Sequence, residues 1–130
     1  MMKRINIFLI LILMVSCAPK ISYNNISARD WSIQKEKEEL DASFSYFSGS
    51  VYQDIAIEKD DELKLIWNTN LEKGAIEFLL INTKGEKLWN STKQIKTGTK
   101  EVNVPITEKG IYKIEVKGYD ASGKFDLKWK

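Results

Sequence analysis

This 130-residue chain has 18 acidic residues but a single cysteine, and its reactive side chains form no pattern typical of a catalytic site. The chain has no histidine, which excludes Ser-His and Cys-His nucleophile pairs and removes the commonest zinc ligand. One run of carboxylates, Asp60-Asp61-Glu62, lies in a predicted turn among lysines. A general acid–base pair needs an environment that separates its two pKa values, such as an apolar cleft. We therefore expect no catalytic residues and no cofactor, and a protein that is not an enzyme.

Calcium is the other chemistry that these residues suggest, because β-sandwich loops often supply oxygen ligands. The candidates are Asp120 with the nearby Ser122, and Asp60-Asp61. However, Asp120-Ala121-Ser122-Gly123 also has the composition of a turn, in which Asp and Gly satisfy the backbone. We favour the turn and expect no metal site.

The N-terminus has the organisation of an export signal. Lys3 and Arg4 precede an apolar run over residues 5–15, which is followed by Ser16-Cys17. A basic start, an apolar core and a small residue before a cleavage site are typical of secretory signals. The run is shorter than the roughly 20 residues that a membrane-spanning helix needs.

Cys17 is the residue to which the sequence assigns a specific chemical role. The segment Leu13-Met14-Val15-Ser16-Cys17 resembles the bacterial lipobox, although Met14 stands where leucine is usual. The resemblance implies a diacylglycerol thioether on Cys17 and cleavage after Ser16. Two acyl chains give stable membrane attachment, whereas one is marginal. We expect a lipid-anchored protein on the extracytoplasmic side of a bacterial membrane, or of the outer membrane in a Gram-negative cell; the alternative is an ordinary signal with an incidental cysteine.

The charge of the expected mature chain is balanced. Lys3 and Arg4 leave with residues 1–16, so that 18 of the 20 basic residues remain against 18 acidic ones. A nucleic-acid-binding domain would show a basic excess, and we expect no nucleic-acid partner. Without cysteines for disulfides, the domain must be stabilised by packing.

Hydrophobic alternation predicts strands from residue 40 onward. Leu40, Ala42, Phe44 and Tyr46 alternate with polar residues, which is the period of a half-buried strand. The same alternation recurs in residues 55–58, 63–68, 102–106, 112–117 and 125–129. Pro105 indicates a strand end or a sheet edge.

Turn residues divide these predicted strands. They stand at Gly49-Ser50, at Gly74 and over residues 118–123. This spacing predicts an all-β, antiparallel, two-sheet β-sandwich of seven to nine strands, jelly-roll-like. We expect a signal peptide over residues 1–16, a lipidated N-terminus with a tether and connector over 17–39, and the sandwich over 40–130. Residues 29–39 suit either a short helix or a charged edge segment.

The strand-and-turn pattern resembles small bacterial lipoproteins and jelly-roll modules of the bacterial pre-peptidase C-terminal type. The residues that carry the resemblance are Phe44-Ser45-Tyr46-Phe47-Ser48-Gly49, Leu71-Glu72-Lys73-Gly74, Asn82-Thr83-Lys84-Gly85, Gly110-Ile111-Tyr112-Lys113-Ile114 and Gly123-Lys124-Phe125-Asp126-Leu127. It implies an accessory or binding role without catalysis.

The aromatic residues bear on what such a module would bind. Trp67 and Trp129 share the parity of core residues, whereas Trp31, Trp89 and Tyr119 are candidates for ligand contacts. We expect a protein-binding or accessory module of the cell envelope. The alternative is a carbohydrate- or cell-wall-binding module, which predicts a pair of exposed, coplanar aromatic rings on one sheet face.

Overall fold

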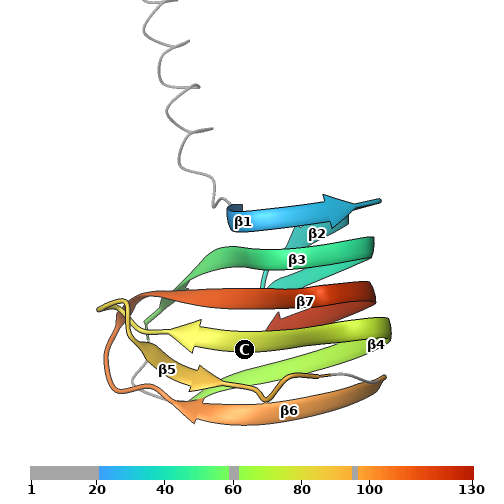
Figure 1. The fold of residues 1–130 in the computed structure, drawn as a ribbon. Helices are drawn as coiled ribbons and strands as arrows, with labels where there is room; N and C mark the ends of the chain where they lie inside the picture. The colour runs from blue at the N-terminus through green and yellow to red at the C-terminus, as the bar shows by residue number, and fades with distance from the viewer. Residues whose placement is uncertain (1–20, 59–61, 95–96) are drawn as a thin grey trace, which may run out of the picture.

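The computed structural model describes residues 21–58, 62–94 and 97–130, and these ranges contain strands and no helix (Figure 1). The strands are β1 (Ile21–Arg29), β2 (Ser32–Glu36), β3 (Glu39–Ile57), β4 (Glu62–Ile81), β5 (Lys87–Asn90), β6 (Gly98–Pro105) and β7 (Gly110–Trp129). Every pairing between them is antiparallel. The predicted all-β, antiparallel fold is confirmed.

Three long strands, β3, β4 and β7, run through both layers of the sandwich. The β5 layer has the order β1-β3-β7-β4-β5 and uses residues 47–57, 110–121 and 75–81 of the long strands. The β6 layer has the order β2-β3-β7-β4-β6 and uses residues 39–44, 123–129 and 62–71. In Figure 1 the long strands fold over so that the two halves face each other.

The long strands bend where the sequence predicts turns. The register shifts between Phe44 and Gly49 in β3, and between Leu71 and Ala75 in β4. Gly49, Gly74 and Gly123 have φ of +114°, +76° and +138°. At Gly123 a Cβ atom would collide with the carbonyl oxygen of Asn70. These signals therefore mark bends within strands rather than chain reversals.

The core lies between the two layers and follows the predicted alternation. Leu40, Phe47, Phe78 and Phe125 are among its fully buried side chains. The predicted core residues Trp67 and Trp129 are 5% and 7% exposed. Residues 21–130 supply both layers and the core between them, and we therefore expect this part of the chain to fold by itself.

The segment expected to be a tether and connector contains two strands in the structure. β1 pairs with the second half of β3, and β2 pairs with its first half. Both are edge strands without a fully buried residue, so that the weak hydrophobic pattern of residues 21–39 did not reveal them. Residues 1–20, including Cys17, lie outside the described residues, and no helix within the described ones is long and apolar enough to cross a membrane.

Candidate ligand-binding groove

A groove of about 490 Å³ lies on the outer face of the β6 layer, and we call it the outer groove. Its walls come from β2, β3, β4 and β7 and from Thr97, just before β6. Its lining residues are mainly polar: Ser32, Gln34, Asp41, Ala42, Ser43, Asn68, Asn70, Thr97, Lys124, Phe125 and Asp126.

The polar side chains of the outer groove form two rows across the strands. Alternate residues of a strand point to the same face, and the antiparallel register places equivalent residues side by side. One row consists of Gln34, Asp41, Asp126 and Asn68. The next row consists of Ser32, Ser43, Lys124 and Asn70. Amide, hydroxyl, ammonium and carboxylate groups thus supply both donors and acceptors along the groove.

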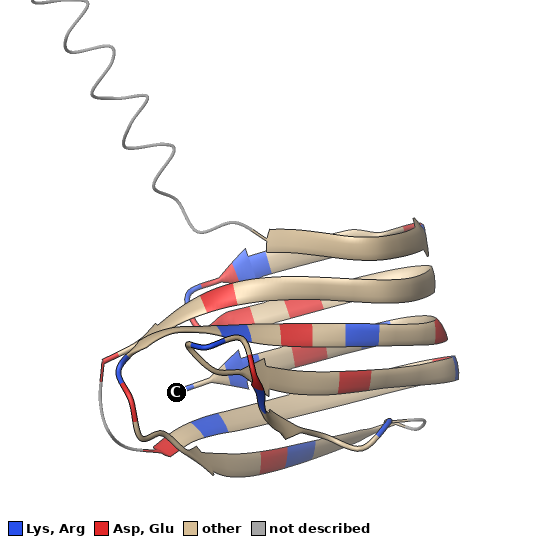
Figure 2. Cartoon of the chain, turned by 60° about the vertical axis from the view of Figure 1, so that its left-hand side comes forward, with Lys and Arg blue, Asp and Glu red and all other residues tan. Residues whose placement is uncertain are grey.

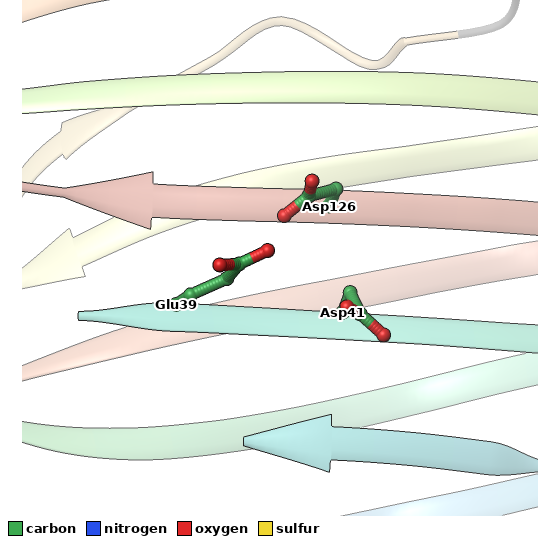
Figure 3. A group of neighbouring side chains, drawn as sticks. All are labelled: Glu39, Asp41 and Asp126. Atoms are coloured by element: carbon green, nitrogen blue, oxygen red, sulfur yellow. The ribbon is translucent and has the colours of Figure 1, made fainter. Parts of the chain in front are cut away.

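Three carboxylates gather at one side of the outer groove. Oxygen atoms of Glu39, Asp41 and Asp126 lie within 4.8 Å of one another (Figure 3). Asp41 and Asp126 are direct cross-strand partners. Two like charges directly opposite each other destabilise a sheet. Desolvation by burial, followed by the charge and hydrogen bonding of Glu39, raises the pKa of Asp126. One of the Asp126 oxygens, Oδ1, is buried without a hydrogen-bond partner.

These carboxylates are the residues that best suit a cation in the described part of the chain. Three carboxylates supply only part of the six to eight oxygen ligands that Ca²⁺ takes, about 2.3–2.6 Å from the ion. Carboxylates that accept hydrogen bonds from ligand hydroxyl groups need no such shell. The arrangement therefore suits hydrogen bonding to a polyhydroxylated ligand at least as well as metal binding.

The loop residues considered for calcium have other roles or lie outside the described residues. Asp120 has φ of +48° at the bend of β7, and its Oδ1 accepts a hydrogen bond of 2.6 Å from the hydroxyl of Tyr46. The predicted turn over residues 120–123 is wrong as a chain reversal, because these residues lie within β7 and bend it. Asp60 and Asp61 are outside the described residues.

Trp31 and Trp89 do not form the exposed aromatic pair that the carbohydrate-binding alternative predicted. Trp31 packs on Phe44 and Phe47, with ring centroids 5.7 and 4.9 Å away. Trp89 packs on Trp67 at 5.5 Å. Both indoles are half-buried, and they lie near opposite edges of the β5 layer, beside β1 and in β5. Neither lines the outer groove.

Tyr119 is held in a polar network on the outer face of the β5 layer. Its hydroxyl donates to Glu77 Oε1 at 2.7 Å, and Asn90 donates to the other oxygen of Glu77 at 2.9 Å. The ammonium of Lys93 lies 4.1 Å from the centre of the ring. The bond to Glu77, followed by burial, raises the pKa of Tyr119 to about 12. Tyr119 therefore belongs to a different face from the outer groove.

The residues of the outer groove were not singled out from the sequence. Alternation does place Asp41, Ser43, Lys124 and Asp126 on the polar side of their strands. Assembling them into rows requires the pairing of residues 39–44 with residues 123–128, far apart in the chain. An apolar strand face is visible in a sequence, whereas a row across strands is not.

Comparisons with known proteins show the fold. No family model and no curated protein matches the chain. The structure of TmCBM61 in complex with β-1,4-galactotriose is similar, with TM-score 0.57 and 16% identity over 88% of each chain. A CBM4 structure gives TM-score 0.50 and 5% identity, over 78% of this chain and 76% of that one. A carbohydrate binding module, CBM6cm-2 from Cellvibrio mixtus lichenase 5A in complex with cellotriose, gives TM-score 0.47 and 10% identity, over 82% and 87%.

The likeness to the first two structures confirms a β-sandwich architecture. The resemblance to pre-peptidase C-terminal modules has no support, because no family model matches.

On the face drawn in Figure 2, acidic and basic residues are interspersed along the strands. Neither sign is confined to a single strand in that view.

Proposed function

We propose that this protein is a non-catalytic, glycan-binding lipoprotein of the bacterial cell envelope, and that a neutral sugar chain lies in its outer groove. The observation that carries the proposal is the pair of polar rows that cross the β6 layer between Gln34 and Asn68 and between Ser32 and Asn70. The β-sandwich fold, shared with modules that bind oligosaccharides, supports it.

The chemistry of the rows suits sugar hydroxyl groups, each of which donates and accepts hydrogen bonds. The carboxylates of Asp41 and Asp126 accept, and the amides of Asn68 and Asn70 do both. The buried, unpartnered oxygen of Asp126 gains a donor when a hydroxyl group reaches it. In the described lining, Lys124 is the one positively charged residue and stands beside two carboxylates, which disfavours an acidic glycan.

The described lining of the outer groove offers no exposed aromatic ring for stacking. Phe125 is the one aromatic residue in its described lining, and it is 2% exposed. Binding then depends on hydrogen bonds that contribute about 0.5–1.5 kcal/mol each in net terms. We expect dissociation constants of about 0.1–1 mM for short oligosaccharides, equivalent to about 4–5.5 kcal/mol. Longer chains gain affinity by occupying more of each row.

A protein-binding role has weaker support. The large, exposed apolar side chains of the described residues are Tyr23, Leu88 and Ile111. Tyr23 is on β1 and Leu88 on β5, at opposite edges of the β5 layer. They do not form the contiguous apolar patch that marks many protein interfaces.

The proposal places the protein on the extracytoplasmic side of a membrane, held by lipid on Cys17. Its support is the basic start, the apolar run and the lipobox-like segment that ends at this cysteine. A tethered module of weak affinity suits a polymeric ligand, since repeated units and many anchored copies raise the effective affinity.

The experiment compares binding of soluble neutral polysaccharides and oligosaccharides, beginning with β-1,4-galactotriose and cellotriose, by calorimetry and affinity electrophoresis. Asn68→Ala and Asp126→Ala each remove a hydrogen-bonding group from the groove and should weaken binding about 2- to 12-fold, the equivalent of one hydrogen bond. Asn103→Ala is the matched control, because Asn103 is exposed on β6 in the same layer and does not line the groove. Absence of binding by every glycan, or equal binding by the groove variants and the wild type, would contradict the proposal.

A further inference from the structure

A second cavity opens at one end of the sandwich, and we call it the end cavity. It has a volume of about 810 Å³ and shares no described lining residue with the outer groove. The turn between β2 and β3, the end of β3, the start of β4 and the end of β7 surround it. Its size is within the range of about 300–1,000 Å³ that is usual for small-molecule sites.

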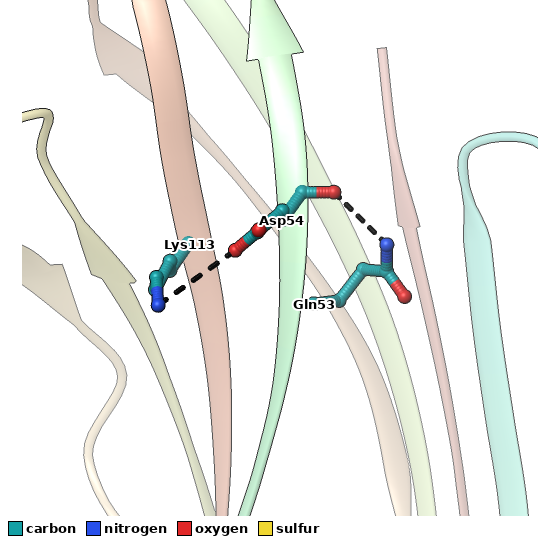
Figure 4. A network of polar contacts seen from close by, with 3 residues as sticks. All are labelled: Gln53, Asp54 and Lys113. Atoms are coloured by element: carbon teal, nitrogen blue, oxygen red, sulfur yellow. Dashed lines mark hydrogen bonds and ion pairs between the residues drawn. The ribbon is translucent and has the colours of Figure 1, made fainter. Parts of the chain in front are cut away.

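Within the described lining of the end cavity, Gln53 has a buried side-chain oxygen that lacks a hydrogen-bond partner. It is 1% exposed and shares the inward face of β3 with Val51 and Ile55. Its Nε2 donates to the carbonyl oxygen of Asp54 at 2.9 Å, whereas its Oε1 has no partner (Figure 4). Buried polar atoms are nearly always hydrogen-bonded, and an apolar residue here would avoid the cost of the orphaned oxygen.

The surroundings of Gln53 are apolar within the cavity and charged at its mouth. Ile55, Leu63 and Trp129 are buried residues of the lining. The described lining also includes three lysines and five carboxylates, among them Lys37 and Glu58. This acidic excess disfavours an anionic ligand.

We propose that the end cavity binds a small, uncharged or cationic molecule with an apolar body and a hydroxyl or amino group. The body packs against Ile55, Leu63 and Trp129, and its O–H or N–H donates to Oε1 of Gln53. Small-molecule sites combine apolar walls with polar groups that fix orientation, and Gln53 among Ile55, Leu63 and Trp129 has this arrangement behind the charged residues of the lining. This site is independent of the glycan proposed for the outer groove.

The test uses benzyl alcohol, toluene and benzoate as probes, added to ¹⁵N-labelled protein comprising residues 18–130 and followed by NMR. Benzyl alcohol should shift the side-chain amide of Gln53 and the indole N–H of Trp129. It should bind about 5- to 10-fold more tightly than toluene, because toluene leaves Oε1 unpaired. Benzoate should bind more weakly than benzyl alcohol.

Gln53→Leu should fold, bind toluene and lose the preference for benzyl alcohol. Gln34→Leu is the matched control, since it changes an exposed glutamine of the outer groove, and it should keep the preference. The inference is overturned if benzyl alcohol moves neither signal, if it binds no more tightly than toluene or benzoate, or if the preference survives in Gln53→Leu. The comparison of the three probes in the wild type decides the matter even if Gln53→Leu does not fold.

Discussion

Gly118→Ala is a direct test of how tightly the bend of β7 packs on the core. A Cβ atom on Gly118 would lie 2.5 Å from Cδ2 and 2.7 Å from Cγ of Phe47. Carbon atoms in contact are normally about 3.5–4.0 Å apart. The ring of Phe47 must therefore move by about 1 Å to admit one methyl group.

The surroundings of Phe47 leave little room for that movement. Its side chain is fully buried, with the rings of Trp31 and Phe44 at 4.9 and 5.2 Å. Overpacking a core typically costs about 1–3 kcal/mol, and we expect the upper end because several rings must shift together. If the free energy of unfolding falls by about 1.5 kcal/mol per M urea, a loss of about 3 kcal/mol lowers the unfolding midpoint by about 2 M.

Urea unfolding of residues 18–130, followed by tryptophan fluorescence, measures this change. Gly98→Ala is the control, because a Cβ there meets no atom within 4 Å, and it should change stability by less than about 0.5 kcal/mol. Phe47→Leu should partly relieve the collision, so that the double variant is more stable than the sum of the single effects predicts, by at least about 1 kcal/mol. Equal stability of Gly118→Ala and wild type, or strict additivity, would refute the packing argument.

Three further changes probe other parts of the molecule. The fold raises the pKa of Asp126, so that the protonated carboxyl favours the folded state. The free energy of unfolding therefore includes a contribution that is present at acidic pH and is lost as the pH rises from the ordinary Asp range through the folded pKa. Asp126→Asn should therefore raise the unfolding free energy at pH 7 by about 0.2–1 kcal/mol, with a gain that shrinks toward pH 4 in urea titrations; a constant gain would contradict it. Tyr119→Phe should cost about 0.5–1.5 kcal/mol and remove from the ultraviolet titration the tyrosine whose pKa is about 12; an unaltered titration would count against the bond to Glu77. Cys17→Ala should abolish lipid labelling and cause release or misprocessing of the protein, and unchanged membrane retention would disprove the anchor.

Which side chains face the core could be predicted from the sequence, because one strand's alternation is a local property. Leu40, Ala42 and Phe44 are buried as expected, and so are Trp67 and Trp129. Pro105 ends β6, which pairs within the described residues with β4 alone. These positions depend on period and on backbone chemistry, both of which are readable along one strand.

The bends and the outer groove could not be predicted in the same way. A glycine with positive φ can close a hairpin or bend a continuing strand, and Gly49 and Gly74 do the latter. The rows of the groove depend on register between strands such as β3 and β7, which is set by packing over the whole molecule. Trp31 packs on Phe44 and Phe47. Its own segment has no regular hydrophobic pattern, so that the sequence could not predict whether its ring faces the core or the solvent.

The place of β7 determines when the sandwich can form. This strand is the last of the described strands in sequence order, yet it lies between β3 and β4 in both layers. Before residues 110–129 are available, the other described strands can form only separate hairpin-like pieces around β3 and around β4. Pairing over such long stretches of sequence is slow. The chain therefore stays open until residues 110–129 are available, and the sandwich closes around β7.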